Sequence, residues 1–226
     1  MIPKIRFERR LFLKHTVGLA VAAFGWPGLL NSSEQEAIKK PIPKTGEKLP
    51  VIGMGTSRTF DIAGDSALRQ KLTDVLQVFF DRGGAVIDSS PMYGNAEQVT
   101  GDLLQAVNNK QSLFAATKVW TRGKQDGIRQ MQRSSRRMGV KVFDLMQIHN
   151  LLDWRVHLET LKSWKAEGKV RYIGITTSHG RFHDELEVIL ENEPLDFVQF
   201  SYNILNRTAE DRLLPIAEDR GIATLI

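Results

Sequence analysis

Cysteine is absent from this chain of 226 residues, and its absence removes several kinds of chemistry at once. No disulfide can form, and neither a thiolate nucleophile nor a thiolate metal site is available. The five histidines show no spacing typical of metal ligands, so we expect no metal site either. Chemistry in this chain would therefore depend on carboxylate, hydroxyl, amine and imidazole groups.

Long apolar runs are also missing. The longest, residues 16–30, has 15 residues interrupted by three glycines and a proline, whereas a membrane-spanning helix needs roughly twenty. This run follows a basic segment, as in a secretory signal. Within that segment Arg9-Arg10-Leu-Phe-Leu-Lys14 resembles the twin-arginine export motif, with Glu8 where the motif usually has Ser or Thr.

We therefore expect residues 1–33 to be a twin-arginine signal and residues 34–226 to form the folded part. The twin-arginine export machinery would then be a partner, and the protein would be periplasmic or otherwise exported. The alternative is an amphipathic N-terminal helix packed on the domain, in a protein that is cytoplasmic or membrane-anchored.

An excess of positive charge is confined to this N-terminal segment. Residues 1–33 hold five basic residues and one acidic residue, whereas the remainder holds 26 basic and 25 acidic residues. A nucleic-acid-binding protein usually carries a basic face, so we expect no nucleic-acid partner. The cluster Arg133, Arg136 and Arg137 is typical of a solvated helix face.

Short apolar segments recur along the rest of the chain and alternate with amphipathic segments of helical period. They begin near Val51, Ala85, Leu113, Phe143, Val170, Phe197 and Ile222, at intervals of 25 to 34 residues. Strands that are apolar throughout are typical of parallel sheets covered on both faces. Two architectures fit this alternation, a doubly wound sheet and an eight-stranded barrel.

Polar residues at the ends of several consecutive segments favour the barrel, because barrel enzymes build their sites at the carboxyl ends of several strands. No GxGxxG follows the first strand, and Gly53-x-Gly55 alone is a weak signal. We therefore predict an α/β fold of the (β/α)8 TIM-barrel type. It is incomplete, with about seven strands and the last βα unit missing. Residues 41–50 are predicted to form a hairpin that closes the bottom of the barrel.

Helix ends are predicted from capping signals. Asn95-Ala-Glu-Gln98 resembles a capping box at the start of a helix. Gly83, Gly168 and Gly221 each follow a helical segment, where a left-handed residue is expected.

Four residues at the predicted strand ends carry the chemistry: Asp88, Tyr93, Lys118 and His149. A phenol has a pKa of about 10 and donates a proton reluctantly at neutral pH unless a neighbouring cation favours its phenolate. Lys118 could supply this cation, Asp88 could hold the lysine in place, and His149 could orient a carbonyl substrate. Together the four groups could hand a proton to a carbonyl oxygen.

The surrounding segments resemble the aldo-keto reductase family. Val86 to Gly94 (VIDSSPMYG) is similar to the family's D-x-A-x-x-Y-G signature, and the four residues match its Asp-Tyr-Lys-His tetrad in order and spacing. Lys118-Val-Trp120 resembles T-K-x-W, residues 172–177 resemble Y-I-G-V-S-N, and residues 198–203 resemble V-Q-x-x-Y-N. The resemblance covers residues 41–226.

This resemblance implies a reductase that converts a small aldehyde or ketone to an alcohol, with NADPH, or alternatively NADH, as the cofactor and Tyr93 as the proton donor. It also implies that Trp120 lines the substrate pocket. The residues that it implies for the cofactor are Gly55, Thr56, Thr176, Thr177, Gln199 and Tyr202.

The sequence departs from the family pattern at three places. Ser90 stands where alanine is usual, and Thr176-Thr177 replace a Ser-Asn pair. The family's segment for the cofactor's adenosine phosphate follows the eighth strand, and we expect it to be missing here.

Two other functions remain open from the sequence. One is a non-catalytic sensor or regulatory subunit that keeps the fold and binds the cofactor. The other is a Schiff-base lyase or aldolase that uses Lys118 as its nucleophile.

Overall fold

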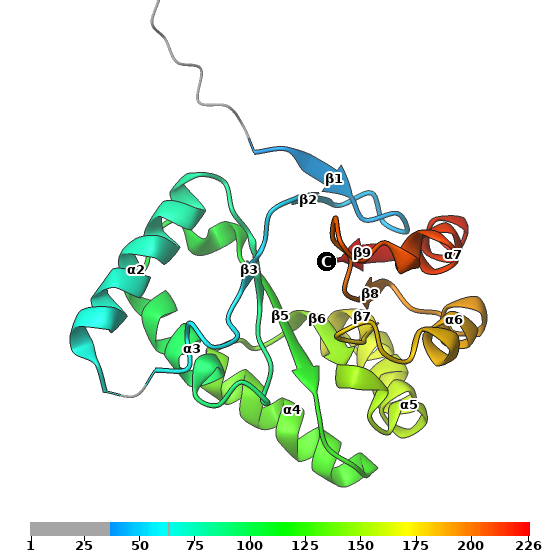
Figure 1. The fold of residues 1–226 in the computed structure, drawn as a ribbon. Helices are drawn as coiled ribbons and strands as arrows, with labels where there is room; N and C mark the ends of the chain where they lie inside the picture. The colour runs from blue at the N-terminus through cyan, green and yellow to red at the C-terminus, as the bar shows by residue number, and fades with distance from the viewer. Residues whose placement is uncertain (1–36, 63) are drawn as a thin grey trace, which may run out of the picture. The chain divides into compact units, whose positions relative to one another are not determined.

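Seven short strands lie side by side, in chain order, in one parallel sheet (Figure 1). The structure, a computed structural model, describes residues 37–62 and 64–226, so the predicted signal lies outside the described residues. The strands are β3 (Met54–Gly55), β4 (Val86–Asp88), β5 (Phe114–Val119), β6 (Phe143–Ile148), β7 (Val170–Thr176), β8 (Phe197–Gln199) and β9 (Ala223–Leu225). Each lies in one of the predicted apolar segments, which confirms all seven predictions.

Helices join the strands and cover the outer side of the curved sheet (Figure 1). They are α2 (Ser66–Asp81), α3 (Ala96–Ala106), α4 (Lys124–Met138), α5 (Trp154–Ala166), α6 (His183–Asn192) and α7 (Leu213–Asp219). Three 3-10 helices, η1 (Lys110–Ser112), η2 (His149–Leu151) and η3 (Thr208–Glu210), lie in the connections. The sheet is a half-barrel whose edges are β3 and β9, as expected for an incomplete barrel of the (β/α)8 type.

Alternation along each strand separates two environments, because successive side chains point to opposite faces. The outer set, such as Val119, Ile148 and Ile175, packs against the helices in the largest hydrophobic cluster. The inner set at the start of the strands is aromatic. The rings of Phe114 and Tyr172 stack with centroids 5.9 Å apart, and Phe197 lies 5.6 Å from Tyr172.

A hairpin lies below this aromatic layer. Strands β1 (Lys39–Pro41) and β2 (Lys48–Pro50) pair antiparallel, which confirms the hairpin predicted for residues 41–50. Ile42 is buried with the inner aromatic cluster. The hydroxyl of Tyr172 donates to Glu47 Oε2 at 2.6 Å, so the hairpin is fastened to the inside of the sheet by both apolar and polar contacts.

The helix ends agree with the predictions in part. Gly83, Gly168 and Gly221 all have positive φ, between 61° and 80°, which confirms the predicted left-handed positions. The capping box predicted at Asn95 is wrong, because the Asn95 side chain makes no capping hydrogen bond. Instead, the Asn95 N–H donates to Asp61 Oδ1 at 2.8 Å.

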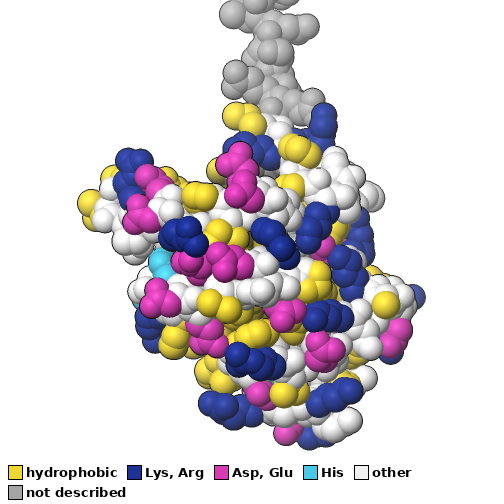
Figure 2. All heavy atoms as spheres, turned by 90° about the vertical axis from the view of Figure 1, so that its right-hand side faces the viewer, with side chains coloured by type: hydrophobic (Ala, Val, Ile, Leu, Met, Phe, Trp, Pro, Cys, Tyr) yellow, Lys and Arg dark blue, Asp and Glu magenta, His cyan; other side chains and the backbone are white. Residues whose placement is uncertain are grey.

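The outer surface carries charges of both signs. On the face in Figure 2, Lys and Arg side chains are interspersed with Asp and Glu. Ion pairs also link neighbouring elements, as Arg212 before α7 does with Glu187 of α6 at 2.6 Å. Of the helices that the structure describes, none combines the length and apolar character needed to cross a membrane.

Candidate active site

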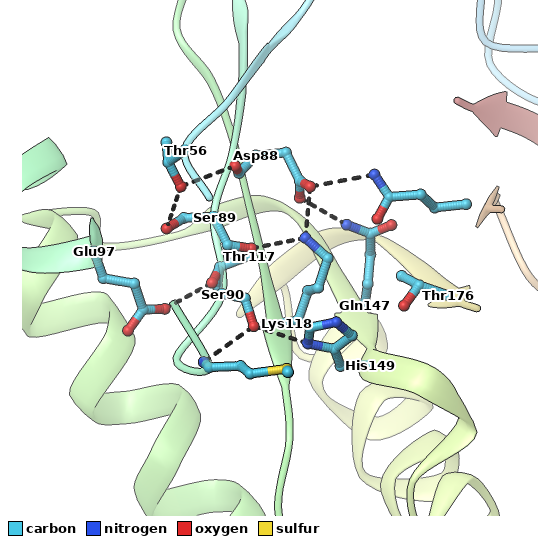
Figure 3. A network of polar contacts seen from close by, with 12 residues as sticks. Thr56, Asp88, Ser89, Ser90, Glu97, Thr117, Lys118, Gln147, His149 and Thr176 are labelled. Atoms are coloured by element: carbon cyan, nitrogen blue, oxygen red, sulfur yellow. Dashed lines mark hydrogen bonds and ion pairs between the residues drawn. The ribbon is translucent and has the colours of Figure 1, made fainter. Parts of the chain in front are cut away.

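A polar layer occupies the inner face of the half-barrel at the carboxyl ends of the strands. Beyond the aromatic layer, the same alternation turns Asp88, Lys118 and Gln147 inward from three different strands (Figure 3). Gln199 of β8 reaches the same layer through its hydrogen bond to Asp88. The register places Lys118 opposite Gln147, while Asp88 lies opposite Ala116, two residues before Lys118. The parallel arrangement therefore collects chemically useful side chains at one rim.

Lys118 and Asp88 form the centre of this layer. Lys118, only 1% exposed, places its Nζ 2.5 Å from Asp88 Oδ2 and donates to the Ser89 carbonyl oxygen at 2.8 Å. Gln147 Nε2 donates to Asp88 Oδ1 at 2.9 Å, and Gln199 Nε2 donates to Oδ2 at 3.3 Å. A buried ammonium is tolerated only with a counter-charge and hydrogen bonds, and this network supplies both.

Tyr93 lies in the loop between β4 and α3, beside this ion pair. Lys118 Nζ is 5.3 Å from the centroid of the Tyr93 ring. The ring meets His149 edge-on, with centroids 5.9 Å apart and an interplanar angle of 84°. The Tyr93 hydroxyl has no hydrogen bond to any described residue, and the side chain is half-buried. The structure thus brings together all four residues singled out from the sequence.

His149 follows β6 directly and is nearly buried. Burial, and secondarily the charge of Lys118, lowers the pKa of its imidazole from 6.5 to about 4. Its Nδ1 lies 2.9 Å from the Ser90 hydroxyl. The imidazole is therefore neutral at physiological pH.

We expect this lowered pKa to make folding sensitive to acid. The unfolded chain takes up a proton near 6.5, whereas the folded His149 remains neutral until about 4. Stability is then lost as pH falls, and between pH 7 and pH 5 the loss due to His149 should be about 2 kcal/mol. Urea unfolding of the wild type and His149→Gln at both pH values measures this. Equal pH dependence in the two proteins would contradict it.

Trp120 stands at the mouth of the layer, with its ring centroid 6.4 Å from that of His149. Its backbone is fixed by Gln130 of α4, whose Oε1 accepts from the Trp120 N–H at 2.5 Å and whose Nε2 donates to the Trp120 carbonyl at 2.9 Å. The next carbonyl, that of Thr121, lies 2.7 Å from His157 Nε2. These hydrogen bonds to α4 and α5 fix the backbone of the loop that carries Trp120. The Trp120 side chain itself remains 39% exposed.

The residues expected for the cofactor fall into three groups. At the β3 end, Gly55 is exposed, and a Cβ placed on it would meet nothing within 4 Å. The next residue, Thr56, is fully buried and its hydroxyl donates to Ser89 Oγ at 2.9 Å. Gly55 thus leaves backbone open to a ligand, while Thr56 supports the loop behind it.

At the β7 and β8 ends, Thr176, Thr177 and Gln199 lie together. The Thr176 hydroxyl accepts from the Asn150 N–H at 3.2 Å, and the Thr177 N–H donates to the Gln199 carbonyl at 2.9 Å. Two buried oxygens at this rim, Thr177 Oγ1 and Gln147 Oε1, have no hydrogen-bond partner among the described residues. Unpaired buried oxygens are costly, so they suit a ligand that carries donors.

Tyr202 has a different environment from the other five residues. Its ring packs against the outer hydrophobic cluster, and its hydroxyl donates to Glu210 of η3. The hydrogen bond to this carboxylate raises the pKa of the Tyr202 hydroxyl. The structure therefore ties Tyr202 to the loop after β8 rather than to the Asp88 layer.

Three site residues are not among those selected from the sequence: Ser90, Gln130 and Gln147. Gln147 lies two residues before His149 in the last part of an apolar strand, so strand alternation carries a signal for it. Ser90 and Gln130 lie in a loop and on a helix. Their contacts with His149 and Trp120 depend on chain packing that no local pattern encodes.

The fold and this rim define an α/β barrel-type protein with a polar site at the carboxyl ends of its strands, and comparison with known proteins identifies the family. The family model described as "Aldo/keto reductase family" matches residues 51–225. The chain belongs to the aldo-keto reductase family.

Individual relatives share the family but little sequence. Aldo-keto reductase YhdN of Bacillus subtilis is 24% identical, over 82% of this chain and 60% of its own length. The NADH-specific methylglyoxal reductase of Escherichia coli is 28% identical, over 83% of this chain and 66% of its own. The chain thus spans about 60–66% of the length of these two curated relatives.

Solved structures show the same fold. The thermostable aldo-keto reductase Tm1743, in complex with the inhibitor epalrestat, superposes with a TM-score of 0.69 at 25% identity and covers 83% of this chain and 71% of its own. An aldo-keto reductase of Klebsiella pneumoniae in complex with NADPH gives a TM-score of 0.68 at 24% identity, over 83% of this chain and 66% of its own.

Proposed function

We propose that this protein is a nicotinamide-dependent reductase that converts a small aldehyde or ketone to an alcohol. The observation that carries the proposal is the convergence of Tyr93, His149 and the buried Lys118–Asp88 pair at one rim. A carbonyl oxygen that is to gain a proton requires a proton donor and hydrogen-bond donors nearby. The phenol could give the proton, the neutral imidazole could donate a hydrogen bond, and the fixed cation could stabilise the phenolate.

A nicotinamide, when bound, supplies the hydride that no side chain can supply. Its place would be the rim between Gly55 and the β7–β8 ends, where backbone is open and two buried oxygens are unpaired. The donors of a carboxamide could satisfy these oxygens. Gln199 and Thr177 would orient this group, with Thr56, Thr176 and Tyr202 supporting the loops around them.

Tyr93 would hand its hydroxyl proton to the substrate oxygen. The cation of Lys118, 5.3 Å from the phenol ring, would favour the phenolate left behind. Asp88 holds Lys118 in place through the ion pair, and the amides of Gln147 and Gln199 hold Asp88. Removing one member would therefore misplace the others.

His149 would donate a hydrogen bond to the same substrate oxygen and stabilise the negative charge that develops there. Such donors are effective because they are oriented before the reaction and lie away from bulk water. The half-exposed ring of Trp120 beside His149 would form one wall of the substrate mouth.

We propose NADPH as the preferred cofactor, with NADH as the alternative. Both occur among the relatives, since one Klebsiella pneumoniae structure contains NADPH and an Escherichia coli relative is NADH-specific. Methylglyoxal, which that relative reduces according to its name, is a suitable first probe for a small carbonyl.

The test is to mix the purified protein with NADPH or NADH and a panel of small aldehydes and ketones. We expect carbonyl-dependent oxidation of one reduced nucleotide, followed by absorbance. Tight nucleotide binding without turnover would favour a cofactor-binding sensor. Covalent trapping of a carbonyl on Lys118 by borohydride would favour the Schiff-base enzyme, although Lys118 is held by both a carboxylate and a carbonyl.

We also propose that residues 1–33 form a twin-arginine signal that directs residues 34–226 to the periplasm. The sequence Arg9-Arg10-Leu-Phe-Leu-Lys14 before an apolar run supports it. Because this export route carries folded proteins, a cofactor bound beforehand could travel with the protein.

Replacing Arg9 and Arg10 together with lysine keeps the charge but removes the paired guanidinium groups. We expect the double variant to remain inside the cell, whereas the wild type is recovered from the periplasm. Fractionation with immunoblotting measures this, and identical distribution of the two proteins would refute the signal.

A further inference from the structure

Ser90 connects the loop after β4 to the imidazole of His149 (Figure 3). Its side chain is fully buried. The hydroxyl oxygen accepts a hydrogen bond from the Met92 N–H at 3.2 Å and lies 2.9 Å from His149 Nδ1. No other hydrogen bond to this oxygen occurs among the described residues.

The direction of the hydrogen bond between Ser90 and His149 Nδ1 follows from where the hydroxyl proton of Ser90 can go. A serine hydroxyl has one proton to donate and two lone pairs that accept. The N–H of Met92 uses one lone pair and cannot take the proton. If His149 Nδ1 also donated to Ser90, the hydroxyl proton would be buried without an acceptor, which proteins rarely tolerate.

We propose that Ser90 is a positioning residue that donates to Nδ1 and so fixes neutral His149 in the tautomer with its proton on Nε2. A neutral imidazole carries a single N–H, so a hydrogen bond to one nitrogen determines what the other presents. The ring is also held in place by its edge contact with Tyr93 and by Trp120.

The consequence for catalysis rests on the proposed reductase function. With the proton on Nε2, His149 offers a donor to the substrate oxygen on the side away from Ser90. In the opposite tautomer a lone pair would face the negatively charged oxygen and repel it. Burial keeps the imidazole neutral, because it lowers the pKa of His149 to about 4, so the tautomer rather than the charge sets what His149 can donate.

The hydrogen bond from Ser90 to His149 is possible because this sequence departs from the family pattern at residue 90. The D-x-A-x-x-Y-G signature that residues 88–94 resemble has alanine at the position of Ser90. An alanine has no hydroxyl, so a chain with the usual residue could not orient its histidine in this way. The tautomer control is thus a specific property that this sequence adds to the shared tetrad.

The tautomer can be measured directly by nitrogen-15 NMR of protein labelled in its histidines, with His149→Gln to assign the signals. We expect His149 Nε2 to carry the proton at neutral pH and Nδ1 to be an unprotonated acceptor. In Ser90→Ala the bias should weaken, and the shifts of both nitrogens should move toward the values of a free neutral histidine side chain. Ser89→Ala, a matched neighbour whose hydroxyl bonds Thr56 instead, should keep the wild-type pattern.

A protonated Nδ1 in the neutral wild type, or an unchanged tautomer in Ser90→Ala, would overturn the proposal. The NMR measurement does not require turnover, so the proposal about Ser90 can be tested separately from the proposed reductase function. Where turnover is present, Ser90→Ala should lower kcat about tenfold, the value of one hydrogen bond to the substrate oxygen. The Kd for the nucleotide should remain unchanged.

Discussion

Replacing Tyr93 with phenylalanine is expected to lower kcat for carbonyl reduction about 1,000-fold, the middle of the range for a lost general acid. The change removes one oxygen atom and leaves the ring, so the contact with His149 and the position of Lys118 should persist. Because the hydroxyl has no hydrogen-bond partner among the described residues, its loss should cost little stability. Steady-state kinetics with NADPH and methylglyoxal measure the effect.

The matched control is Tyr172→Phe, the same substitution at the opposite end of the half-barrel. Tyr172 contacts Glu47 and the hairpin rather than the polar layer. We expect this variant to keep its kcat while losing some stability. Fluorescence titration should show equal nucleotide affinity in the wild type and Tyr93→Phe. A Tyr93→Phe protein with full turnover would rule out Tyr93 as the proton donor.

The second large effect concerns stability. Gly101 lies on the face of α3 that packs against α4, and a Cβ placed on it would be 2.0 Å from the Arg137 carbonyl oxygen and 2.9 Å from Met138 Cα. Both atoms belong to the backbone, so no side chain can rotate away. Gly101→Ala should therefore lower the free energy of unfolding by about 3 kcal/mol, because overpacking outweighs the helix propensity gained.

Gly64→Ala provides the control, since a Cβ at Gly64 meets nothing within 4 Å and its φ is not in the left-handed region. Urea unfolding of both variants should show a large loss for Gly101→Ala and little change for Gly64→Ala. If Gly101→Ala unfolded at the wild-type urea concentration, the close approach of α3 and α4 would be disproved.

The repetitive parts of the fold could be predicted because local pattern and tertiary structure agree there. Each strand is short, apolar and bounded by turn signals, and the positive φ of Gly83, Gly168 and Gly221 follows from the helix ends before them. The convergence of Asp88, Lys118 and His149 also follows, since parallel strands end at one rim. Alternation of side chains then turns them to the same face.

The interactions that the sequence could not indicate all join distant segments. At the start of α3, the N–H of the N-cap residue Asn95 donates to Asp61, 34 residues earlier, and the Asn95 side chain makes no capping hydrogen bond. Gln130 reaches back from α4 to hold the Trp120 backbone. The contact between Ser90 and His149 spans 59 residues. Each of these contacts depends on how the loops and helices pack against the sheet, and the spacing of residues along the sequence does not predict this packing.

The most direct test of the proposed chemistry is to follow the hydride. NADPH or NADH carrying deuterium at both hydrogen positions of nicotinamide C4 is mixed with the protein and a small aldehyde, and the alcohol is analysed by mass spectrometry. We expect one deuterium on the carbinol carbon of the product in the wild type. An alcohol without deuterium, or no alcohol with either labelled nucleotide, would contradict the assignment of this rim to carbonyl reduction.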